Sequence, residues 1–392
     1  MRTRITNGRL IFPDSVITET DICFDNGKII PYSADSIGET VIDAEGCFVS
    51  PGFIDIHLHG GDGYEFIDGT AEAVIKASAI HAMHGAATII PTLSGFDMKT
   101  TRKALSVISE VMKSGKALPN IAGVHLEGPY FSPKQCGAQD PAYIRDPDRE
   151  EYEGIVEDFG PVIRRWSYAP ERKNSVEFQE FLDSHGIIGA SGHTDAELCH
   201  MKEVYEKGNR LVTHLYSCTS TVTRLNGYRH LGVIETAFLY PDIDVETIAD
   251  GSHLPPELLK MIYRIKGREH MCLVSDAIRY GGCNDCEGTV TGTENVPYII
   301  EDGVAKLSDR SAFAGSIATA DVLIRTCISA GIHLTDAVYM MTAVPARIMG
   351  LSGKGSLSEG SDADLVIFDE NINVKKVVIG GRVYECKDGA CS

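Results

Sequence analysis

The 392-residue chain lacks several features that would assign it to a broad class of protein. It has no uncharged apolar run approaching the roughly 18 to 20 residues that are needed to span a membrane. Basic residues are scarce, because 36 Lys and Arg stand against 55 Asp and Glu, a formal net charge of −19. This balance argues against a nucleic-acid binder, which has to neutralise phosphates. We therefore expect no membrane and no nucleic acid as partners, and a locally basic pocket for any anionic substrate.

The first residues, MRTRITNGRLIF, lack the apolar core and the small-residue cleavage site of a secretory signal peptide. Without such a signal, the eleven cysteines indicate a reducing compartment and not a framework of disulfides. Cys283 and Cys286 form a CxxC pair with no second pair, whereas structural zinc sites normally have four ligands. We therefore expect a cytoplasmic protein with no zinc or redox site at this pair.

The two ends of the chain have a similar composition of short strands and turns. Residues 4–49 contain alternating strands and an Asn26-Gly27 pair typical of a hairpin turn. The C-terminal residues contain ADLVIFD and then VKKVVIGGRVYE, with a Gly-Gly turn. We predict that residues 1–50 and 355–392 together form one small β-sandwich domain.

Between these ends, short apolar runs alternate with helix-like stretches such as 71–84 and 197–207. The eight runs are FIDIHLH, GAATIIPT, IAGVHLE, RRWSYAPE, GIIGASGH, RLVTHLY, VETIADGSH and MCLVSDA. Alternation of this kind is typical of a parallel (β/α)₈ barrel, also called a TIM-like barrel. We predict an α/β protein whose residues 51–354 form a barrel of this type, and the histidines and carboxylates at its strand ends predict that the barrel is metal-dependent and catalytic.

Potential metal ligands gather where the predicted strands end, the edge at which barrel enzymes place their chemistry. They are His57, His59, Glu127, His193, His214, Asp250, His253 and Asp276. His57 and His59 are two residues apart on a strand and therefore point to the same side. A single strand-end histidine is usually a hydrogen-bonded core residue, but a whole set at one edge indicates a site. We predict Zn²⁺ or Fe²⁺ ahead of Mg²⁺, with His125 lying deeper and supporting the ligands or the core.

The chain resembles the amidohydrolase superfamily and, within it, the N-acetylglucosamine-6-phosphate deacetylase family. The segments that carry the resemblance are PGFIDIHLHG (51–60), HLEGPYFSPKQCGAQ (125–139), SGHTDA (191–196), THLYSCT (213–219), IADGSH (248–253), LVSDA (273–277), FAGS (313–316) and EGSDADLVIFD (359–369). They span nearly the whole chain, and HLEGP together with the later motifs is specific to the family. The resemblance implies hydrolysis of the acetamide of N-acetylglucosamine 6-phosphate to glucosamine 6-phosphate and acetate, in amino-sugar catabolism.

The resemblance also implies roles for individual residues. Glu127, His193 and His214 correspond to the main metal ligands, and Asp276 corresponds to the acid/base aspartate. His57 and His59 place this chain with members that keep this pair and hold a second metal, so we expect one or two divalent metal ions per chain. The substrate contacts that the family implies are Ala138, Gln139, Ser217, Cys218, Arg229, Asp250, His253, Phe313, Ala314 and Gly315. In the family the phosphate-binding groups come from the neighbouring subunit, which implies a homodimer with shared active sites.

Departures from the family pattern leave some assignments open. THLY is commonly followed by Asn-Ala-Met, whereas this chain has Ser217-Cys218-Thr219, which leaves open a preference for N-acetylgalactosamine 6-phosphate. Arg224 competes with Arg229 as the phosphate arginine, and we prefer Arg229 because it precedes HLGVIE. Arg229 could instead pair with a surface carboxylate, and Asp276 could instead cap a loop.

Two other classes of function also fit a metal barrel. One is hydrolysis or deamination of a different amide or imide. The run RRWSYAPE has no lysine that could be carboxylated to bridge two metals, which weighs against the cyclic-amide hydrolases of the superfamily. The other is a non-catalytic sugar-phosphate binder, which is disfavoured because the chain keeps every expected ligand and the acid/base residue.

Overall fold

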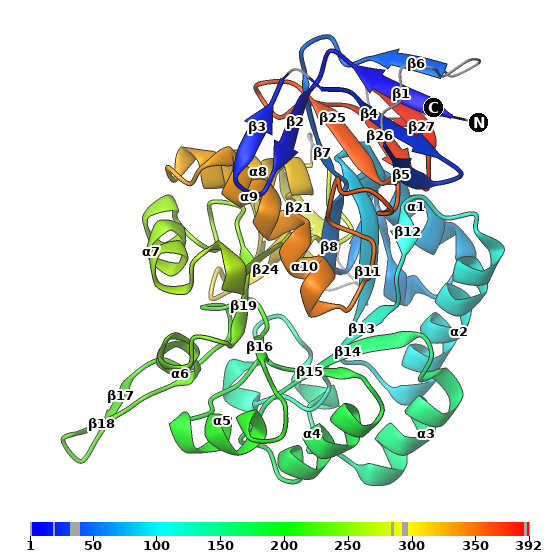
Figure 1. The fold of residues 1–392 in the computed structure, drawn as a ribbon. Helices are drawn as coiled ribbons and strands as arrows, with labels where there is room; N and C mark the ends of the chain where they lie inside the picture. The colour runs from blue at the N-terminus through cyan, green and yellow to red at the C-terminus, as the bar shows by residue number, and fades with distance from the viewer. Residues whose placement is uncertain are drawn as a thin grey trace.

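Eight strands surround the centre of the molecule in the computed structural model (Figure 1). The structure describes residues 2–18, 20–31, 40–283, 286–291, 297–387 and 390–391. The barrel strands are β8 (Phe53–Leu58), β11 (Ala86–Ser94), β13 (Val124–Glu127), β14 (Ile163–Tyr168), β15 (Ile188–Ser191), β16 (Leu211–Val212), β19 (Asp244–Ile248) and β20 (Met271–Val274). Each strand overlaps one of the eight apolar runs, and neighbouring strands pair in parallel from β8 through β11 to β20. The predicted α/β barrel is confirmed.

The barrel closes irregularly between its last and its first strand. Within the described residues, β20 and β8 form no continuous ladder, and a single parallel bridge joins Leu58 to Ala277. The backbone N–H of Asp276 also donates to the carbonyl oxygen of His57 at 2.8 Å. The barrel is thus nearly closed, and the closing contacts bring the residues after β20 against the end of β8.

Ten helices within the described residues surround the barrel strands (Figure 1). They are α1 (Ala71–Met83), α2 (Met98–Ser114), α3 (Arg149–Phe159), α4 (Ser175–Ser184), α5 (Leu198–Tyr205), α6 (Val233–Leu239), α7 (Pro256–Lys266), α8 (Ala320–Ser329), α9 (Leu334–Met341) and α10 (Ala343–Ile348). The start of α2 follows from its sequence, because the Asp97 side chain accepts hydrogen bonds from the N–H groups of Lys99 and Thr100. The helix ends at Gly115, whose φ of 63° is left-handed and suits glycine.

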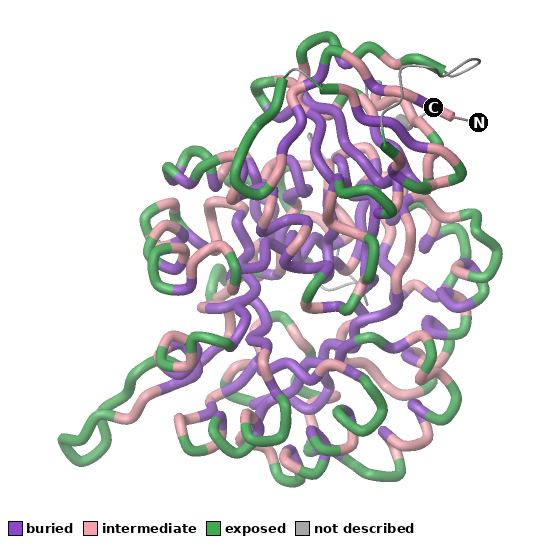
Figure 2. Tube along the Cα trace, in the orientation of Figure 1, coloured by how far each residue is buried: buried purple, intermediate pink, exposed green. Residues whose placement is uncertain are grey.

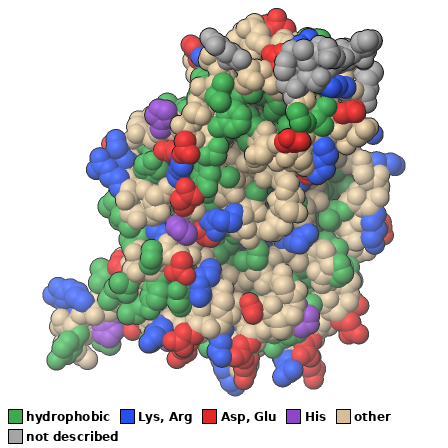
Figure 3. Space-filling model, viewed as in Figure 1, with side chains coloured by type: hydrophobic (Ala, Val, Ile, Leu, Met, Phe, Trp, Pro, Cys, Tyr) green, Lys and Arg blue, Asp and Glu red, His purple; other side chains and the backbone are tan. Residues whose placement is uncertain are grey.

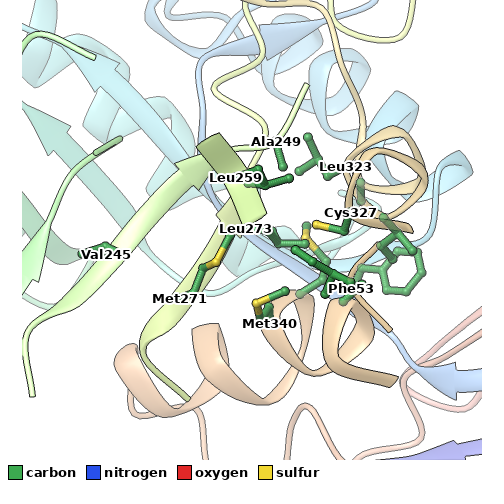
Figure 4. Packing of buried hydrophobic residues seen from close by; sticks show 14 of the residues in the cluster. Phe53, Val245, Ala249, Leu259, Met271, Leu273, Leu323, Cys327 and Met340 are labelled. Atoms are coloured by element: carbon green, nitrogen blue, oxygen red, sulfur yellow. The ribbon is translucent and has the colours of Figure 1, made fainter. Parts of the chain in front are cut away.

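Apolar side chains join strands and helices on the outside of the barrel. Figure 4 shows Phe53 of β8 and Leu273 of β20 packed with Cys327 of α8 and Met340 of α9. All four are fully buried, and the barrel strands are buried along most of their length (Figure 2). Burial of apolar area at this scale is the main force that holds the βα units together.

The two ends of the chain meet in a pair of sheets beside the barrel, at the top of Figure 1. One sheet has the order β5-β4-β1-β6 and the other β28-β27-β26-β25-β7-β2-β3. These strands are β1 (Thr3–Thr6), β2 (Arg9–Phe12), β3 (Ser15–Ile17), β4 (Ile22–Asp25), β5 (Lys28–Ile30), β6 (Thr40–Asp43), β7 (Phe48–Pro51), β25 (Leu365–Phe368), β26 (Val374–Ile379), β27 (Arg382–Lys387) and β28 (Ala390–Cys391). A shared core that includes Phe24, Val49 and Leu365 lies between the sheets, as in a sandwich. The exact two-domain division at residues 50 and 355 stays a prediction.

The expected turns between these strands are present. Asn26 and Gly27 both have positive φ, 48° and 75°, in the turn from β4 to β5. Gly380 and Gly381, with φ of 55° and 79°, connect β26 to β27 in the same way. Two-residue turns with positive φ at both positions match the twist of antiparallel strands, which explains these residue types.

Shorter elements complete the fold. β17 (Thr223–Leu225) and β18 (Tyr228–His230) form a hairpin that projects from the molecule at the lower left of Figure 1. A four-stranded antiparallel sheet contains β21 (Gly288–Thr291), β22 (Pro297–Glu301), β23 (Val304–Leu307) and β24 (Phe313–Ser316). The remaining pieces are β9 (Gly60–Gly61), β10 (Tyr64–Glu65), β12 (Asn120–Ile121) and the 3₁₀ turns 66–68, 133–135, 141–143 and 268–270. Among the described residues, none of the helices has both the length and the apolar character required to cross a bilayer.

Candidate metal centre and substrate pocket

Six side chains that the sequence singles out converge at one rim of the barrel. Each lies in the last residues of a barrel strand or no more than two residues beyond it: His57, His59, Glu127, His193, His214 and Asp276. His59 is partly exposed, and the other five are buried. The carboxyl ends of parallel strands meet at one rim, so residues far apart in sequence become neighbours there.

Glu127 lies at the centre of this cluster. Its Oε1 is 3.0 Å from Nε2 of His214, 3.3 Å from Nε2 of His193 and 3.4 Å from Nε2 of His57. Its Oε2 is 3.3 Å from Nε2 of His59. One carboxylate therefore faces four imidazole nitrogens, an arrangement suited to bridging two cations.

Asp276 lies on the side of His57 and His59. Its Oδ1 is 3.4 Å from Nε2 of His57 and 3.1 Å from Nε2 of His59. The ligand atoms thus fall into two groups of three, one of His57, Glu127 and His214 and the other of His57, His59 and Asp276. Each group is compact enough to hold one ion, and His57 belongs to both.

The backbone is unusual at three of these positions. His193, His214 and Asp276 have φ values of 44°, 29° and 49°, in the left-handed region that residues other than glycine rarely adopt. Each is the second residue after its strand, where the chain turns away from the barrel. Such conformations cost about 1–3 kcal/mol each and cluster at functional sites. At this energetic cost, the left-handed backbone directs the three side chains toward the cluster.

Hydrogen bonds on the far side of the rings fix their orientation. Nδ1 of His193 is 2.9 Å from the carbonyl oxygen of Gln135, which can only accept, so Nδ1 carries a proton and Nε2 is the nitrogen that faces the cluster. Nδ1 of His59 is 3.1 Å from Oγ of Ser94, and Nδ1 of His57 is 3.1 Å from Oε2 of Glu246. In all three cases Nε2 is the atom directed at Glu127.

The electrostatics of the site couple its acids and bases. Burial lowers the pKa of His57, but Glu127, Asp276 and Glu246 outweigh burial and raise the pKa to about 9. Burial also raises the pKa of Glu127, yet His57 and the hydrogen bonds of His193 and His214 hold that pKa well below its usual range. Asp276 is likewise brought to a pKa of about 2, against burial, by His57 and His59. Both carboxylates are therefore anions at neutral pH.

These residues fit a divalent transition metal. Nε2 of His57 is completely buried and makes no hydrogen bond within the described structure, although carboxylate oxygens lie on both sides of it. The Nε2 atoms of His193 and His214 are 3.2 Å apart. Two nitrogens bound to tetrahedral zinc at about 2.05 Å would be separated by about 3.3 Å. A cluster of imidazoles and carboxylates with an unsatisfied buried nitrogen is the donor set that Zn²⁺ or Fe²⁺ prefers.

A cavity of about 320 Å³ opens directly above the cluster. The predicted substrate residues that line it are Ala138, Gln139, Ser217, Cys218, His253, Phe313, Ala314 and Gly315. Gln139 also contacts the metal cluster, since its Nε2 donates to Oε2 of Glu127 at 3.2 Å. The volume is near the lower end of the range for small-molecule sites, roughly 300–1,000 Å³.

Two predicted substrate residues lie outside the cavity lining. Asp250 is directly below His253 and accepts from it, with Oδ2 2.7 Å from Nδ1. Arg229 is exposed on β18 of the projecting hairpin, and its only described side-chain hydrogen bond goes to the carbonyl of Gly227 at 3.3 Å. Figure 3 shows basic and apolar side chains together on this hairpin, where Leu225 is 57% and Tyr228 76% exposed. Within one chain, therefore, Arg229 is not part of the pocket.

The structure adds residues that the sequence reasoning missed. Further cavity-lining residues are Glu65, Ser94, Gly95, Phe96, Asp140, Tyr143, Tyr216, Ile278, Tyr298 and Ala312. Arg165 and Glu246 lie completely buried below the cluster. Both residues could have been recognised from the sequence, because a charged residue within an apolar barrel strand needs a partner. His125 is hydrogen-bonded through Nδ1 to Thr92 at 3.1 Å and through Nε2 to Ser167 at 2.7 Å, so both of its nitrogens have protein partners.

Comparison with known proteins shows the family of the chain. The sequence profile of the amidohydrolase family matches residues 48–384, and the chain belongs to this family. Within the family, it is similar to the N-acetylglucosamine-6-phosphate deacetylase of Lysinibacillus sphaericus, with 31% identity over 93% of each chain. It is also similar to the N-acetylgalactosamine-6-phosphate deacetylase of Escherichia coli O157:H7, with 26% identity over 96% of this chain and 97% of that one.

Solved structures of two proteins have the same fold as this chain. The N-acetylglucosamine-6-phosphate deacetylase of Pasteurella multocida superposes with a TM-score of 0.90 at 24% identity, covering 98% of this chain and 100% of the other, which shows the shared fold. A Mycobacterium smegmatis variant of that enzyme type, solved in complex with N-acetyl-D-glucosamine 6-phosphate, superposes with a TM-score of 0.87 at 26% identity and 98% coverage of both chains.

Proposed function

We propose that this chain is a metal-dependent deacetylase that hydrolyses N-acetylglucosamine 6-phosphate to glucosamine 6-phosphate and acetate, in amino-sugar catabolism. The observation that carries the proposal is the cluster of four imidazoles and two carboxylates at the floor of the pocket. It occurs in a chain that is 31% identical to a deacetylase over nearly its full length. Fold, site chemistry and similarity thus point to the same reaction.

Glu127, His193 and His214, whose facing atoms lie 3.0–3.3 Å from one another, would hold the principal metal. His57, His59 and Asp276 offer a second position beside it. When bound, a divalent transition metal supplies a Lewis acid and lowers the pKa of water toward about 7. Zn²⁺ and Fe²⁺ are the proposed ions, one or two per chain. His57 connects the two positions because its Nε2 faces both Glu127 and Asp276.

Asp276 is the proposed acid and base. Its carboxylate is anionic and sits at the floor of the cavity, so it can accept a proton from the attacking water. The same group can then return that proton to the departing nitrogen as the C–N bond breaks, one residue serving both steps. The acyl carbon gains the water oxygen, and the amino sugar leaves as a neutral amine.

Recognition of the phosphate needs placed donors, because a chain with a net charge of −19 repels a sugar phosphate at long range. His253 lines the cavity and is held by Asp250 through Nδ1, which leaves Nε2 available to the substrate. Arg229 can reach a phosphate only in the pocket of another subunit if the hairpin extends there. We therefore propose a homodimer with shared active sites. We also propose a cytoplasmic location, because sugar phosphates occur in that compartment.

A second candidate substrate is N-acetylgalactosamine 6-phosphate, because a relative named N-acetylgalactosamine-6-phosphate deacetylase matches 96% of this chain. The test is acetate release from both sugar phosphates by metal-loaded protein and by chelator-stripped protein. We expect turnover of the glucosamine derivative that disappears on chelation and returns with Zn²⁺ or Fe²⁺. Faster turnover of the galactosamine derivative would exchange the two candidates, and full activity of metal-free protein would contradict the mechanism.

A further inference from the structure

A charged pair lies beneath the metal centre, where charge is expensive. Arg165 of β14 and Glu246 of β19 are both 0% exposed and form an ion pair inside the barrel. Replacing such a buried pair by well-packed apolar residues is often neutral or stabilising. Neither residue has a part in the reaction described above, so the pair requires another explanation.

Glu246 contacts two of the expected metal ligands at once. Its Oε2 is 3.1 Å from Nδ1 of His57, and it accepts a hydrogen bond from the backbone N–H of His214 at 3.3 Å. Its other oxygen, Oε1, faces Arg165. A single carboxylate therefore links β8 to the residues that follow β16, on the side of the His57 ring opposite to Glu127.

Arg165 is anchored on several sides. Its Nη2 donates to Oγ1 of Thr213 at 3.2 Å and to Oγ of Ser167 at 3.4 Å, and its Nη1 reaches the carbonyl of Ile56 at 3.5 Å. Ile56 and Thr213 directly precede His57 and His214 in the chain. The guanidinium thus ties the residue before each ligand, through the Ile56 carbonyl and the Thr213 hydroxyl, to the carboxylate of Glu246.

We propose that Glu246 is a positioning residue that turns Nε2 of His57 toward Glu127 and Asp276, and that Arg165 holds Glu246 in place for this task. By accepting the Nδ1–H of His57, Glu246 leaves Nε2 as the nitrogen that would give up its proton to a metal, and Nε2 is the buried atom that makes no hydrogen bond within the described structure. The inference rests on the proposed function, because it requires a metal at this site. Loss of such a carboxylate partner typically lowers metal affinity by about 10- to 100-fold.

The competing explanation is that the pair only holds strands together. A structural role would lower stability in a variant without changing how tightly the folded protein binds metal. The chain offers a matched control on the same strand, because Asp244 of β19 is also buried and also pairs with an arginine and a histidine. Its oxygens lie 2.7 Å from Arg347 and 2.9 Å from Nδ1 of His270, at the end of the strand away from the ligands.

The experiment titrates chelator-stripped protein with Zn²⁺ in competition with a chromophoric chelator, without any activity measurement. We expect Glu246→Gln to weaken Zn²⁺ binding by about 10- to 100-fold, and Asp244→Asn to leave it unchanged. In a His57→Asn background, Glu246→Gln should have little further effect, because the ring that it orients is gone. An equal loss in that background would overturn the assignment to His57.

Glu246→Gln leaves Arg165 without a full counter-charge and can fail to fold for that reason. The paired variant Arg165→Met/Glu246→Leu removes both charges and is expected to fold, as judged by circular dichroism and thermal unfolding. It should show the same weakened Zn²⁺ binding, because Nδ1 of His57 again lacks its acceptor. A folded paired variant that binds Zn²⁺ within twofold of the parent would overturn the inference. A parent protein that binds neither Zn²⁺ nor Fe²⁺ would instead overturn the proposed metal centre itself, a separate result.

Discussion

At the residue scale, the site depends on one carboxylate. Glu127 is 2% exposed, and its carboxylate lies within 3.4 Å of Nε2 of four histidines. It therefore contacts the proposed ligands of both metal positions. We predict that Glu127→Gln loses bound metal and most turnover, because an amide supplies one neutral oxygen where two charged ones are needed. Metal analysis of protein purified without chelator and acetate release measure the two effects. Full metal content together with parental activity would contradict the central role of Glu127.

Asp276 has a separable role, since the carboxylate contacts described for it within the cluster are those with His57 and His59. Asp276→Asn keeps the shape of the side chain and removes its basicity. We predict that kcat falls by about 10²- to 10⁴-fold, the usual contribution of a general acid–base. The metal held by Glu127, His193 and His214 should remain, which metal analysis of the same sample checks. Turnover within threefold of the parent would assign the proton transfer to another group.

At the scale of single elements, the first turn of α8 contains a buried acid that is independent of the metal centre. Burial raises the pKa of Asp321, but hydrogen bonds and charges from His84 and Arg325 outweigh burial and lower the pKa to about 2. A depressed pKa stabilises the folded state above the unfolded value of about 3.8, and this stabilisation is lost as pH falls toward 2. The helix start also favours a negative charge.

We therefore predict that Asp321→Asn lowers the free energy of unfolding by about 2 kcal/mol at pH 7, and by roughly half as much at pH 3. Urea unfolding of parent and variant at both pH values measures the difference. Glu359→Gln, which changes an exposed carboxylate, is the control and should have little effect at either pH. A difference that stays constant between pH 7 and pH 3 would show that the charge of Asp321 is not the cause.

The projecting hairpin is the second element with a prediction of its own. Arg224 of β17 and Arg229 of β18 are cross-strand partners, so they provide a matched pair for substitution. We predict that Arg229→Ala strongly raises KM for the 6-phosphate, because a planar guanidinium can bind two phosphate oxygens. We expect the parent to turn over unphosphorylated N-acetylglucosamine poorly and the variant to change this rate little, and we expect Arg224→Ala to resemble the parent. Equal losses on both substrates would mean that Arg229 does not contact the phosphate.

At the scale of the whole molecule, the barrel and the terminal sheets share apolar contacts. The ring of Phe53 on β8 lies 5.9 Å from the ring of Phe368 on β25, and both belong to the cluster of Figure 4. We predict that Phe53→Ala lowers the free energy of unfolding by about 3–5 kcal/mol, through lost burial and the cavity left behind. Urea unfolding measures this loss, with the 57% exposed Leu239→Ala as the control. A loss below about 1 kcal/mol would show that the interface relaxes to fill the space.

The sequence by itself determined the strand order and the identity of the chemical groups. Each of the eight apolar runs became a barrel strand because strand periodicity and turn residues are local properties that survive folding. His57 in β8 and His59, one residue beyond it, both face Glu127 for the same reason. Asn26-Gly27 forms its hairpin turn because only certain residues accept positive φ. The candidate ligands were also recognisable, because chemistry in a parallel barrel gathers at the carboxyl ends of its strands.

Only the tertiary structure decided how these groups are arranged. The position of Glu127 between four imidazoles, the support of His57 by Glu246 and Arg165, and the closing contacts of Asp276 all join segments far apart in the chain. Tertiary structure also places Arg229 outside the pocket of its own chain, and it brings Tyr298 of β22 into the lining of that pocket. Distances of this kind depend on how the barrel closes and on how loops cross its rim, and local periodicity contains no information about either.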